Sequence, residues 1–446
     1  MNIKQFEDKP LAHYSYAILS GNKIALVDPS RNTTPYYAYA EENQAEIVAV
    51  FETHPHADFV SSHLQIHLET GAELFASKLV GADYPHTGFD DGDIFKMGSV
   101  TFSAINTPGH SPDSISIYAK DDKDNHAVFT GDTLFIGDVG RPDLREKAGN
   151  MKAKREELAK AMYNTMQHKY NHLPNKTLVY PAHGAGSLCG KNMSSDSSST
   201  MGNERIGNWA FKDLSEADFV DHILADQPFI PSYFGFDVDI NKNGAENMEK
   251  SLGLVPFLFG VSKLEDDTLV VDTRDENEFK KGHLPNSINI MARTENDKIE
   301  TWLGAIVQPK EPFYLVIDSV TDRQEILERV AKIGYEKQIK AILTLSETSK
   351  KQSDRLDFDA FKKHPENYTI IDIRNKSEFK EARFFELAIN LPLHELRNRI
   401  AEIPTDKPIV VHCAGGYRSA AGSSVIAKEL KDNQVLDLSD KINEFK

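Results

Sequence analysis

Six side chains with metal-binding chemistry follow short apolar segments in the first half of the chain. They are His54, His56, Asp58, His110, Asp132 and His183. The first three come directly after the apolar segment 47–51, and each of the others follows a strand-like segment of its own. A single histidine on a polar loop is more often structural. Six candidate ligands after four successive strand-like segments instead predict a metal centre, because loops after strands carry much of a protein's binding chemistry.

A cysteine near the end of the chain has the setting of a nucleophile. Cys413 follows a strand-like segment and precedes Gly415, Gly416 and Arg418, and a helix is expected to begin near Ser419. The N–H groups of a tight turn, the positive end of the helix and the arginine would all favour the thiolate, which is the attacking form. The two glycines provide the conformational freedom and close backbone approach that such a turn needs.

The composition limits the classes of function. The chain has 446 residues, 40% of them hydrophobic and 27% charged, which is typical of a folded protein with two to four domains. The net charge of −17 disfavours nucleic acid and anionic lipid as partners. With two cysteines, no apolar leader and no long apolar run, we expect a cytoplasmic protein in a reducing compartment.

Two types of element are expected to position these residues. Short β-branched segments at 23–27, 46–51, 100–105, 127–130 and 177–180 predict strands. Between the last two, Leu158, Met162 and Met166 recur every four residues and predict a core-packing helix over 154–170. The serine-rich segment 193–200 has the composition of a linker, but its place after His183 also fits an ordered active-site loop.

The last 190 or so residues contain a duplication. Asp272-x-Arg274 and the following Glu-Phe-Lys return as Asp372-x-Arg374 and Glu-Phe-Lys, one hundred residues later (372 − 272). Each copy begins with a strand-like run and later reaches a second one, which predicts two α/β domains of about a hundred residues. When the second strand-like runs of the two copies are aligned, Asp318 lies opposite Cys413. The first copy contains no cysteine.

The metal-binding pattern resembles the metallo-β-lactamase superfamily, an αββα sandwich with its metal site at one edge. That superfamily usually has His-x-His-x-Asp-His, but Phe59 occupies the place of the last histidine. Because that histidine helps to bind a second metal, the substitution favours a mononuclear centre. The resemblance to the persulfide dioxygenases of this superfamily implies one Fe(II) per chain, held by His54, His110 and Asp132. Two imidazoles and one carboxylate suit a non-haem iron oxygenase.

The same resemblance implies supporting roles for other residues. His56, Asp58 and His183 would orient the ligands or hydrogen-bond bound oxygen. Cys189 is either a second persulfide-carrying thiol, activated by Lys191 and Lys212, or an ordinary cysteine. Arg141 could clamp an anionic group of the thiol carrier or form a surface salt bridge.

The C-terminal loop resembles the active loop of rhodaneses, which are sulfurtransferases. Four residues separate Cys413 from Arg418, as in that family, and this loop size suits a persulfide sulfur better than phosphate. Asp372 and Arg374 match a supporting Asp-x-Arg motif. The first copy lacks both the thiol and the paired glycines, so the resemblance implies an inactive domain with a packing or positioning role.

Together these features predict a multidomain α/β protein, and the resemblance implies that the two rhodanese-like domains have central parallel sheets. We expect a dioxygenase-like domain at 1–250, an inactive rhodanese-like domain at 255–350 and an active one at 356–446. The resemblance implies oxidation of thiol persulfides by O₂ to sulfite, followed by sulfur transfer through Cys413 to give thiosulfate, in a homo-oligomer. Two alternatives remain: a zinc thioester hydrolase of the glyoxalase II type, and a sulfur-carrier module with a degenerate metal site.

Overall fold

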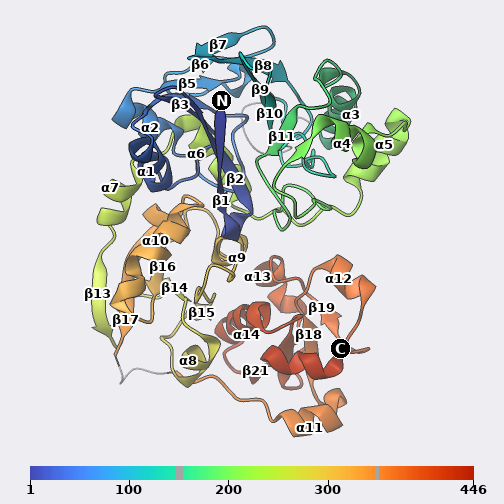
Figure 1. The fold of residues 1–446 in the computed structure, drawn as a ribbon. Helices are drawn as coiled ribbons and strands as arrows, with labels where there is room; N and C mark the ends of the chain where they lie inside the picture. Colours follow the sequence, from blue (N-terminus) through green and yellow to red (C-terminus); the bar gives the residue numbers. More distant parts are fainter. Residues whose placement is uncertain (146–153, 347–350) are drawn as a thin grey trace. The chain divides into compact units, whose positions relative to one another are not determined.

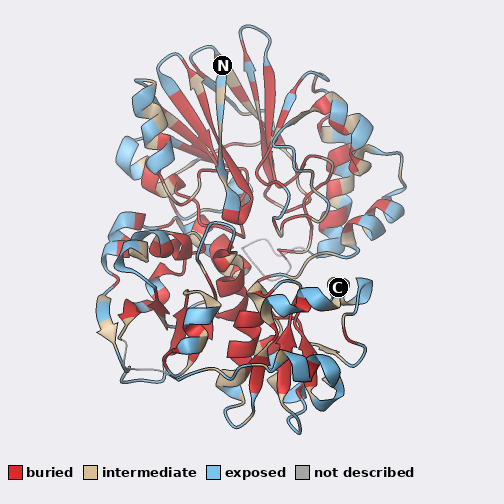
Figure 2. Ribbon diagram, turned by 60° about the horizontal axis from the view of Figure 1, so that its bottom comes forward, coloured by how far each residue is buried: buried red, intermediate tan, exposed pale blue. Residues whose placement is uncertain are grey.

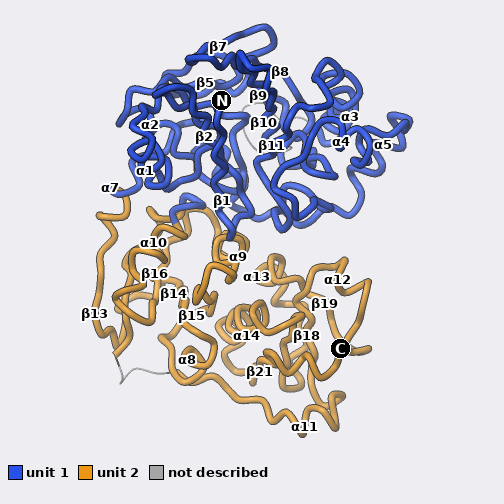
Figure 3. Tube along the Cα trace, in the orientation of Figure 1, with its two compact units in different colours: residues 1–250, 331–334 blue, residues 251–330, 335–446 orange. Residues whose placement is uncertain are grey.

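The computed structural model describes residues 1–145, 154–346 and 351–446, which form two compact units. Unit 1 comprises residues 1–250 and 331–334, and unit 2 comprises residues 251–330 and 335–446 (Figure 3). Each unit has its own sheets and its own buried core. No helix among the described residues is long and apolar enough to cross a membrane.

Two six-stranded sheets form the centre of unit 1 (Figure 1). The first, in the order β1-β2-β3-β4-β5-β6, consists of Asn2–Asp8, His13–Ser20, Lys23–Val27, Glu46–Phe51, Glu73–Ala76 and Thr87–Gly88. The second has the order β12-β11-β10-β9-β8-β7. Its strands, in chain order from β7, are Ile94–Met97, Val100–Asn106, Ile115–Asp121, His126–Gly131, Leu178–Pro181 and Ser199–Thr200.

The helices between residues 1 and 253 include those that cover the outer faces of the two sheets. They are α1 (Thr34–Glu42), α2 (His63–Thr70), α3 (Arg155–Asn164), α4 (Met201–Gly207), α5 (Glu216–Leu224), α6 (Phe234–Asn243) and α7 (Met248–Gly253). Tyr36 and Ile66 of α1 and α2 pack in one core with the first sheet, and Met162 and Phe219 of α3 and α5 pack in another with the second. A third core, which includes Phe51, fills the space between the sheets. These three cores confirm the αββα sandwich.

The strands predicted in unit 1 are present, with shifts of one residue at some ends. The predicted helix over 154–170 is divided into α3 and a π-helical turn, Thr165–Lys169, and its Leu158, Met162 and Met166 are buried as predicted. The serine-rich segment is not a free linker. Ser194 N–H donates to the carbonyl of Ile136 at 3.0 Å, and Ser199–Thr200 forms the edge strand of the second sheet.

Unit 2 contains two parallel sheets, one for each copy of the duplication. The first has the order β13-β17-β16-β14-β15, and in chain order its strands are Phe257–Val261, Leu269–Asp272, Ser287–Asn289, Phe313–Val316 and Ile339–Leu345. The second has the order β19-β18-β20-β21, with β18 to β21 at Thr369–Asp372, Ile389–Asn390, Ile409–His412 and Val435–Asp437. The predicted α/β duplication with parallel sheets is confirmed.

The helices of unit 2 connect these parallel strands, as parallel pairing requires. They are α8 (Glu276–Lys281), α9 (Ile299–Ile306), α10 (Arg323–Ala331), α11 (Phe358–Lys363), α12 (Lys376–Glu381), α13 (Leu396–Arg399) and α14 (Tyr417–Glu429). The strands are largely buried and most helices expose one face (Figure 2). In α14, however, every residue from Ser419 to Ile426 is buried, because the helix packs on its own sheet and on β15 of the first copy.

The strand register corrects the alignment of the two copies by one residue. Asp272 pairs with Val316 in the first sheet, and Asp372 pairs with His412 in the second. The residue after Val316 is Ile317, so Ile317, and not Asp318, occupies the place of Cys413. The two apolar runs differ in length, which allowed the sequence alignment to slip. The conclusion that the first copy lacks a thiol is unchanged.

Candidate metal centre and sulfur-transfer loop

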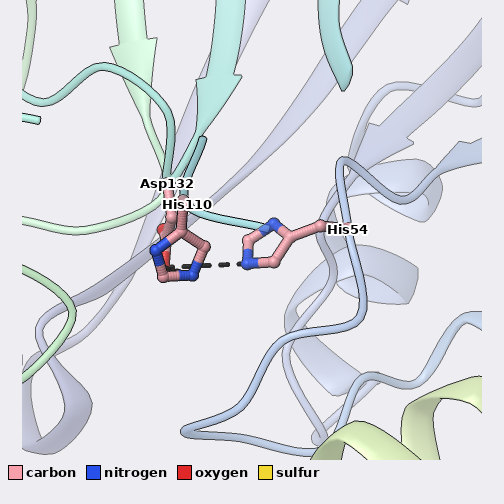
Figure 4. Close-up of side chains that lie close together, drawn as sticks. All are labelled: His54, His110 and Asp132. Carbon is pink, nitrogen blue, oxygen red and sulfur yellow. Dashed lines mark ion pairs between the residues drawn. The ribbon is translucent and has the colours of Figure 1, made fainter. Parts of the chain in front are cut away.

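His54, His110 and Asp132 come together at one edge of the αββα sandwich (Figure 4). His54 follows β4, His110 follows β8 and Asp132 follows β10. The Nε2 atoms of His54 and His110 lie 3.7 and 3.6 Å from the same oxygen, Oδ2 of Asp132. The three predicted metal ligands therefore converge on one point, although they lie up to 78 residues apart in the sequence (132 − 54).

The two carboxylate oxygens of Asp132 have different surroundings. Oδ1 accepts a hydrogen bond from Nδ1 of His183 at 2.7 Å, whereas Oδ2 faces His54 and His110. Nε2 of His183 lies 2.9 Å from a carboxylate oxygen of Asp58. His183 thus links two carboxylates and leaves one oxygen of Asp132 for an ion. This arrangement fits the supporting role predicted for His183 and Asp58.

Asp28 orients the first histidine, and sequence reasoning missed it. Its oxygens accept hydrogen bonds from N and Oγ1 of Thr53, both at 2.8 Å, and Thr53 Oγ1 lies 3.0 Å from Nδ1 of His54. This contact turns Nε2 of His54 toward Asp132. Asp28 follows directly after β3, beside the strand that leads to His54, so its position at the same sheet edge was the available signal.

His56 lies beside the three ligands but belongs to a different cluster. Its Nε2 is 3.3 Å from Oδ1 of Asp28, and its ring centre is 4.1 Å from that of His54. Phe59 packs against His56 and His13, with ring centres 4.4 and 3.9 Å apart. The phenyl ring therefore brings apolar surface to the place where the usual motif supplies an imidazole.

Burial and charge oppose one another in this site. Burial lowers the pKa of His54 and of His110, which keeps both imidazoles neutral and able to bind a metal. Burial also favours the neutral form of His183, but Asp132 and Asp58 outweigh it and raise the His183 pKa well above its usual value. Although burial alone would raise it, the pKa of Asp132 lies well below its ordinary value because His183 and the two ligand histidines favour the carboxylate.

The residues present fit a divalent metal ion. Nε2 of His54 and Oδ2 of Asp132 are buried and have no hydrogen-bond partner among the described residues, which is costly unless an ion satisfies them. Gly140 keeps the site compact, since a Cβ there would collide with the carbonyl of Asp132. Two neutral imidazoles and one carboxylate form an open ligand set with room for further ligands.

The structure contradicts the activation predicted for Cys189. This thiol is fully buried, and burial together with nearby Asp58 and Asp132 raises its pKa well above the usual value. The Lys191 ammonium donates to the carbonyls of His222 and Ala225, and that of Lys212 donates to the carbonyl of Ile206. Neither lysine lowers the pKa of the thiol, because both are bound elsewhere. Cys189 instead forms a cluster with Asp58 and His183.

Arg141 is neither a surface residue nor an open anion clamp. Its side chain is 1% exposed and makes two hydrogen bonds to Asp143, at 2.7 and 2.8 Å. A third donor reaches the carbonyl of Leu188 at 3.1 Å. The guanidinium therefore holds the segment before Cys189. The predicted salt bridge is present, but it is buried and does not lie on the surface.

The Cys413 turn has the geometry that the glycines predicted. The Gly416 N–H donates to Cys413 Sγ at 3.1 Å, and the Gly415 N–H lies 3.5 Å from it. Gly416 has φ +107°, a conformation that favours glycine. Helix α14 begins at Tyr417, two residues earlier than predicted, so Arg418 lies in its first turn.

Arg418 has a carboxylate partner that sequence reasoning did not assign. Two of its nitrogens donate to Glu378, both at 2.7 Å. Arg418 lies near enough to Cys413 to interact with it electrostatically, but Glu378 neutralises part of its charge. Glu378 belongs to the repeated Glu-Phe-Lys motif, so its recurrence was the signal that could have identified it.

Two family models match different parts of the chain. Residues 8–168 match the metallo-beta-lactamase superfamily, and residues 261–343 and 357–446 match the rhodanese-like domain. A solved metallo-beta-lactamase structure from Staphylococcus aureus is 29% identical, with a TM-score of 0.68, and covers 77% of this chain and 99% of its own.

Two curated relatives match the first part of the chain. Human mitochondrial persulfide dioxygenase ETHE1 is 31% identical over 36% of this chain and 59% of its own length. A probable hydroxyacylglutathione hydrolase of Schizosaccharomyces pombe is 30% identical over 38% of this chain and 63% of its own. The chain thus spans about three fifths of the length of these relatives. The chain therefore carries a domain that matches the metallo-beta-lactamase superfamily in its first part and two rhodanese-like domains in its second.

Proposed function

We propose that this chain oxidises low-molecular-weight thiol persulfides and transfers sulfur to the product. In this proposal, residues 1–250 form the dioxygenase, residues 255–350 an inactive rhodanese-like domain and residues 356–446 the sulfurtransferase. One Fe(II) is held by His54, His110 and Asp132. The observation that carries the proposal is the open two-histidine, one-carboxylate site in a chain that also holds a rhodanese-type thiol loop.

The first reaction converts RSSH, O₂ and H₂O into RSH, sulfite and two protons. When bound, the iron supplies the redox chemistry for O₂ and a site for the substrate sulfur. The residues of this chain orient and shield that site. Asp28 and Thr53 orient His54, His183 holds one oxygen of Asp132, and Phe59 with its neighbours excludes water.

The second reaction transfers sulfane sulfur through Cys413. The thiolate attacks the outer sulfur of a second RSSH, so that an S–S bond forms on Cys413 and RS⁻ leaves. Sulfite then attacks this outer sulfur, thiosulfate leaves and the Cys413 thiolate is regenerated. The N–H groups of Gly415 and Gly416 favour negative charge on Sγ at the start and the end of the cycle.

A thioester hydrolase is the second candidate, and the similarity to a hydroxyacylglutathione hydrolase favours it. Such an enzyme would use a metal-activated hydroxide and preferably two metals. Phe59 argues against it, since it replaces a ligand of the second metal with an apolar ring.

Metal analysis and O₂ uptake by the purified chain test the proposal. We expect about one iron per chain and rapid uptake on addition of glutathione persulfide, with sulfite and thiosulfate as products. The variant His54→Ala should lose both iron and uptake, whereas His168→Ala, at an exposed position, should retain them. Zinc without O₂ uptake, together with hydrolysis of an S-acylglutathione, would establish the second candidate instead.

A further inference from the structure

Helix α8 of the thiol-free copy makes direct contacts with the segment that supports the Cys413 turn. Glu276 Oε1 accepts a hydrogen bond from Ser439 Oγ at 2.7 Å. Lys280, one helical turn later, forms an ion pair with Glu276 and lies 2.7 Å from Asp437 Oδ2. Two residues of the first copy thus bind both ends of the segment 437–439 in the second copy.

The segment 437–439, together with Asp440, packs directly against Gly416, and we call these four residues the wall behind Gly416. A Cβ at Gly416 would lie 3.2 Å from both Ser439 Oγ and Asp440 N, so no space separates the two backbones. Ser439 itself has φ +49°, which is unusual for a residue other than glycine. Its N–H donates to Asp437 Oδ1 at 2.9 Å. The segment keeps this conformation through hydrogen bonds, and Glu276 provides one of them from outside the copy.

The position of Gly416 determines the environment of the thiol. Its N–H is the nearer of the two backbone donors to Cys413 Sγ, at 3.1 Å. Any displacement of Ser439 would give Gly416 room to retreat and would lengthen this hydrogen bond. The chain of contacts from Lys280 and Glu276 through Asp437 and Ser439 therefore ends at the reactive sulfur.

Further contacts hold the rest of α14 against the first copy. Tyr417 donates its hydroxyl hydrogen to the carbonyl of Met291 at 2.9 Å, and the N–H of Asn289 donates to Ser424 Oγ at 2.9 Å. The helix that begins directly after Gly416 is thus attached to the first copy at two points. These contacts are independent of Glu276 and Lys280, and they keep the two copies together when either of those side chains is changed.

The ion pair also stabilises a buried charge. Burial raises the pKa of Asp437 to about 6, and Lys280 counteracts this shift while Glu276 adds to it. Without Lys280, the carboxylate that holds the Ser439 N–H would lose its cationic partner in a buried site, and this loss would weaken the wall behind Gly416.

We propose that Glu276 and Lys280 are positioning residues for Cys413, and that the thiol-free copy is therefore a working part of the sulfur-transfer site. This inference rests on the proposed sulfur transfer through Cys413. It gives the copy without a thiol a role beyond packing. Through Glu276 and Lys280, this copy fixes the segment 437–440, which keeps the Gly416 N–H in hydrogen-bond contact with Cys413 Sγ.

Alkylation of Cys413 by iodoacetamide, followed by mass spectrometry of the full chain across a pH series, tests the inference. In Lys280→Met and Glu276→Ala, we expect the pH midpoint of alkylation to rise by about one unit, so that the rate near neutral pH falls about tenfold. Lys280→Arg should restore most of the rate. The control is Lys281→Met on the same helix, because Lys281 is 59% exposed and pairs only with Glu278 among the described residues. It should match the unaltered chain.

The results separate the two proposals. Alkylation needs no persulfide, so an unaltered chain that transfers no sulfur would contradict the proposed function only. If the alkylation rates of Lys280→Met and Glu276→Ala stay within twofold of those of the unaltered chain across the pH series, the positioning roles are overturned. An equal shift of the pH midpoint in Lys281→Met would overturn them as well. If Lys280→Met fails to fold, Ser439→Ala removes the hydroxyl alone and should show the same upward shift. An unchanged profile in that variant would also overturn the inference.

Discussion

The two rhodanese-like copies share one framework around the Asp-x-Arg motif. Arg274 makes bidentate contacts with Asp272 and donates to the carbonyl of Gly282 at 2.8 Å, and Arg374 does the same with Asp372 and the carbonyl of Ala382 at 2.7 Å. An asparagine amide in each copy donates to the carbonyls of both motif residues, at 2.9 and 3.0 Å.

The loops that follow the next strand differ completely. In the second copy, Cys413 Sγ accepts hydrogen bonds from the backbone N–H groups of Gly415 and Gly416. In the first copy, Ile317 is followed by Asp318 and Ser319, and the side chains of Ser319 and Asp322 form a capping box. Its N–H groups are thus used within the loop itself. The comparison teaches that both copies keep the Asp-x-Arg framework, whereas only the loop of the second copy presents a thiol to backbone N–H groups.

Exchange of the nucleophile tests this separation most strongly. Cys413→Ser should lower thiosulfate formation more than about 1,000-fold, with sulfite accumulating, because the attacking thiolate is gone. Ile317→Cys in the first copy should restore none of it, since that loop offers no glycine N–H groups. Thiosulfate and sulfite are measured by chromatography. Full thiosulfate output from Cys413→Ser would contradict the division of labour.

Removal of either framework arginine should destabilise its own copy. Arg374→Ala and Arg274→Ala each leave a buried aspartate without its partner, which costs about 3 kcal/mol. Hydrogen exchange of β18 and β14 would measure the two losses separately. Arg383→Ala, at an exposed position whose guanidinium lies over the Phe379 ring, is the control. A loss of sulfur transfer with no change in exchange would assign Arg374 to the chemistry instead.

The two glycines of the active turn form a matched pair. Gly416→Ala should cost about 1–2 kcal/mol and slow sulfur transfer, because φ +107° disfavours a side chain and the new Cβ would press on Ser439 and Asp440. Gly415→Ala meets nothing within 4 Å and should have a small effect. Urea denaturation and thiosulfate assays compare the variants. Equal losses in both would show that space behind Gly416 is not the determining factor.

The smallest effect is expected at the asparagines. Asn289→Ala and Asn390→Ala remove the same pair of hydrogen bonds from the two copies, and each should cost about 1 kcal/mol. Denaturant midpoints of the two variants provide the measurement. A much larger loss in only one copy would mean that the shared framework is not equivalent in energy.

Much of the site was predictable because ligands that follow strands are recognised by residue type. His54, His110 and Asp132 each come after an apolar strand, and the structure brings both imidazoles close to one carboxylate oxygen of Asp132. Asp28 was missed because a single aspartate after a strand has no distinctive spacing. The burial of Arg141 and the binding of the Lys191 ammonium to the carbonyls of His222 and Ala225 were not predictable, since both depend on contacts between segments remote in sequence.

By itself, the sequence determined the duplication, the candidate metal ligands, the single cysteine in a rhodanese-like loop and the types of most elements, because these depend on residue chemistry and short-range periodicity. Only the tertiary structure decided that Ile317 replaces Cys413, that Glu378 binds Arg418 and that Glu276 and Lys280 support the turn behind Gly416. Strand register and the packing of one copy on another are set by contacts between distant residues, and local patterns do not encode those pairings.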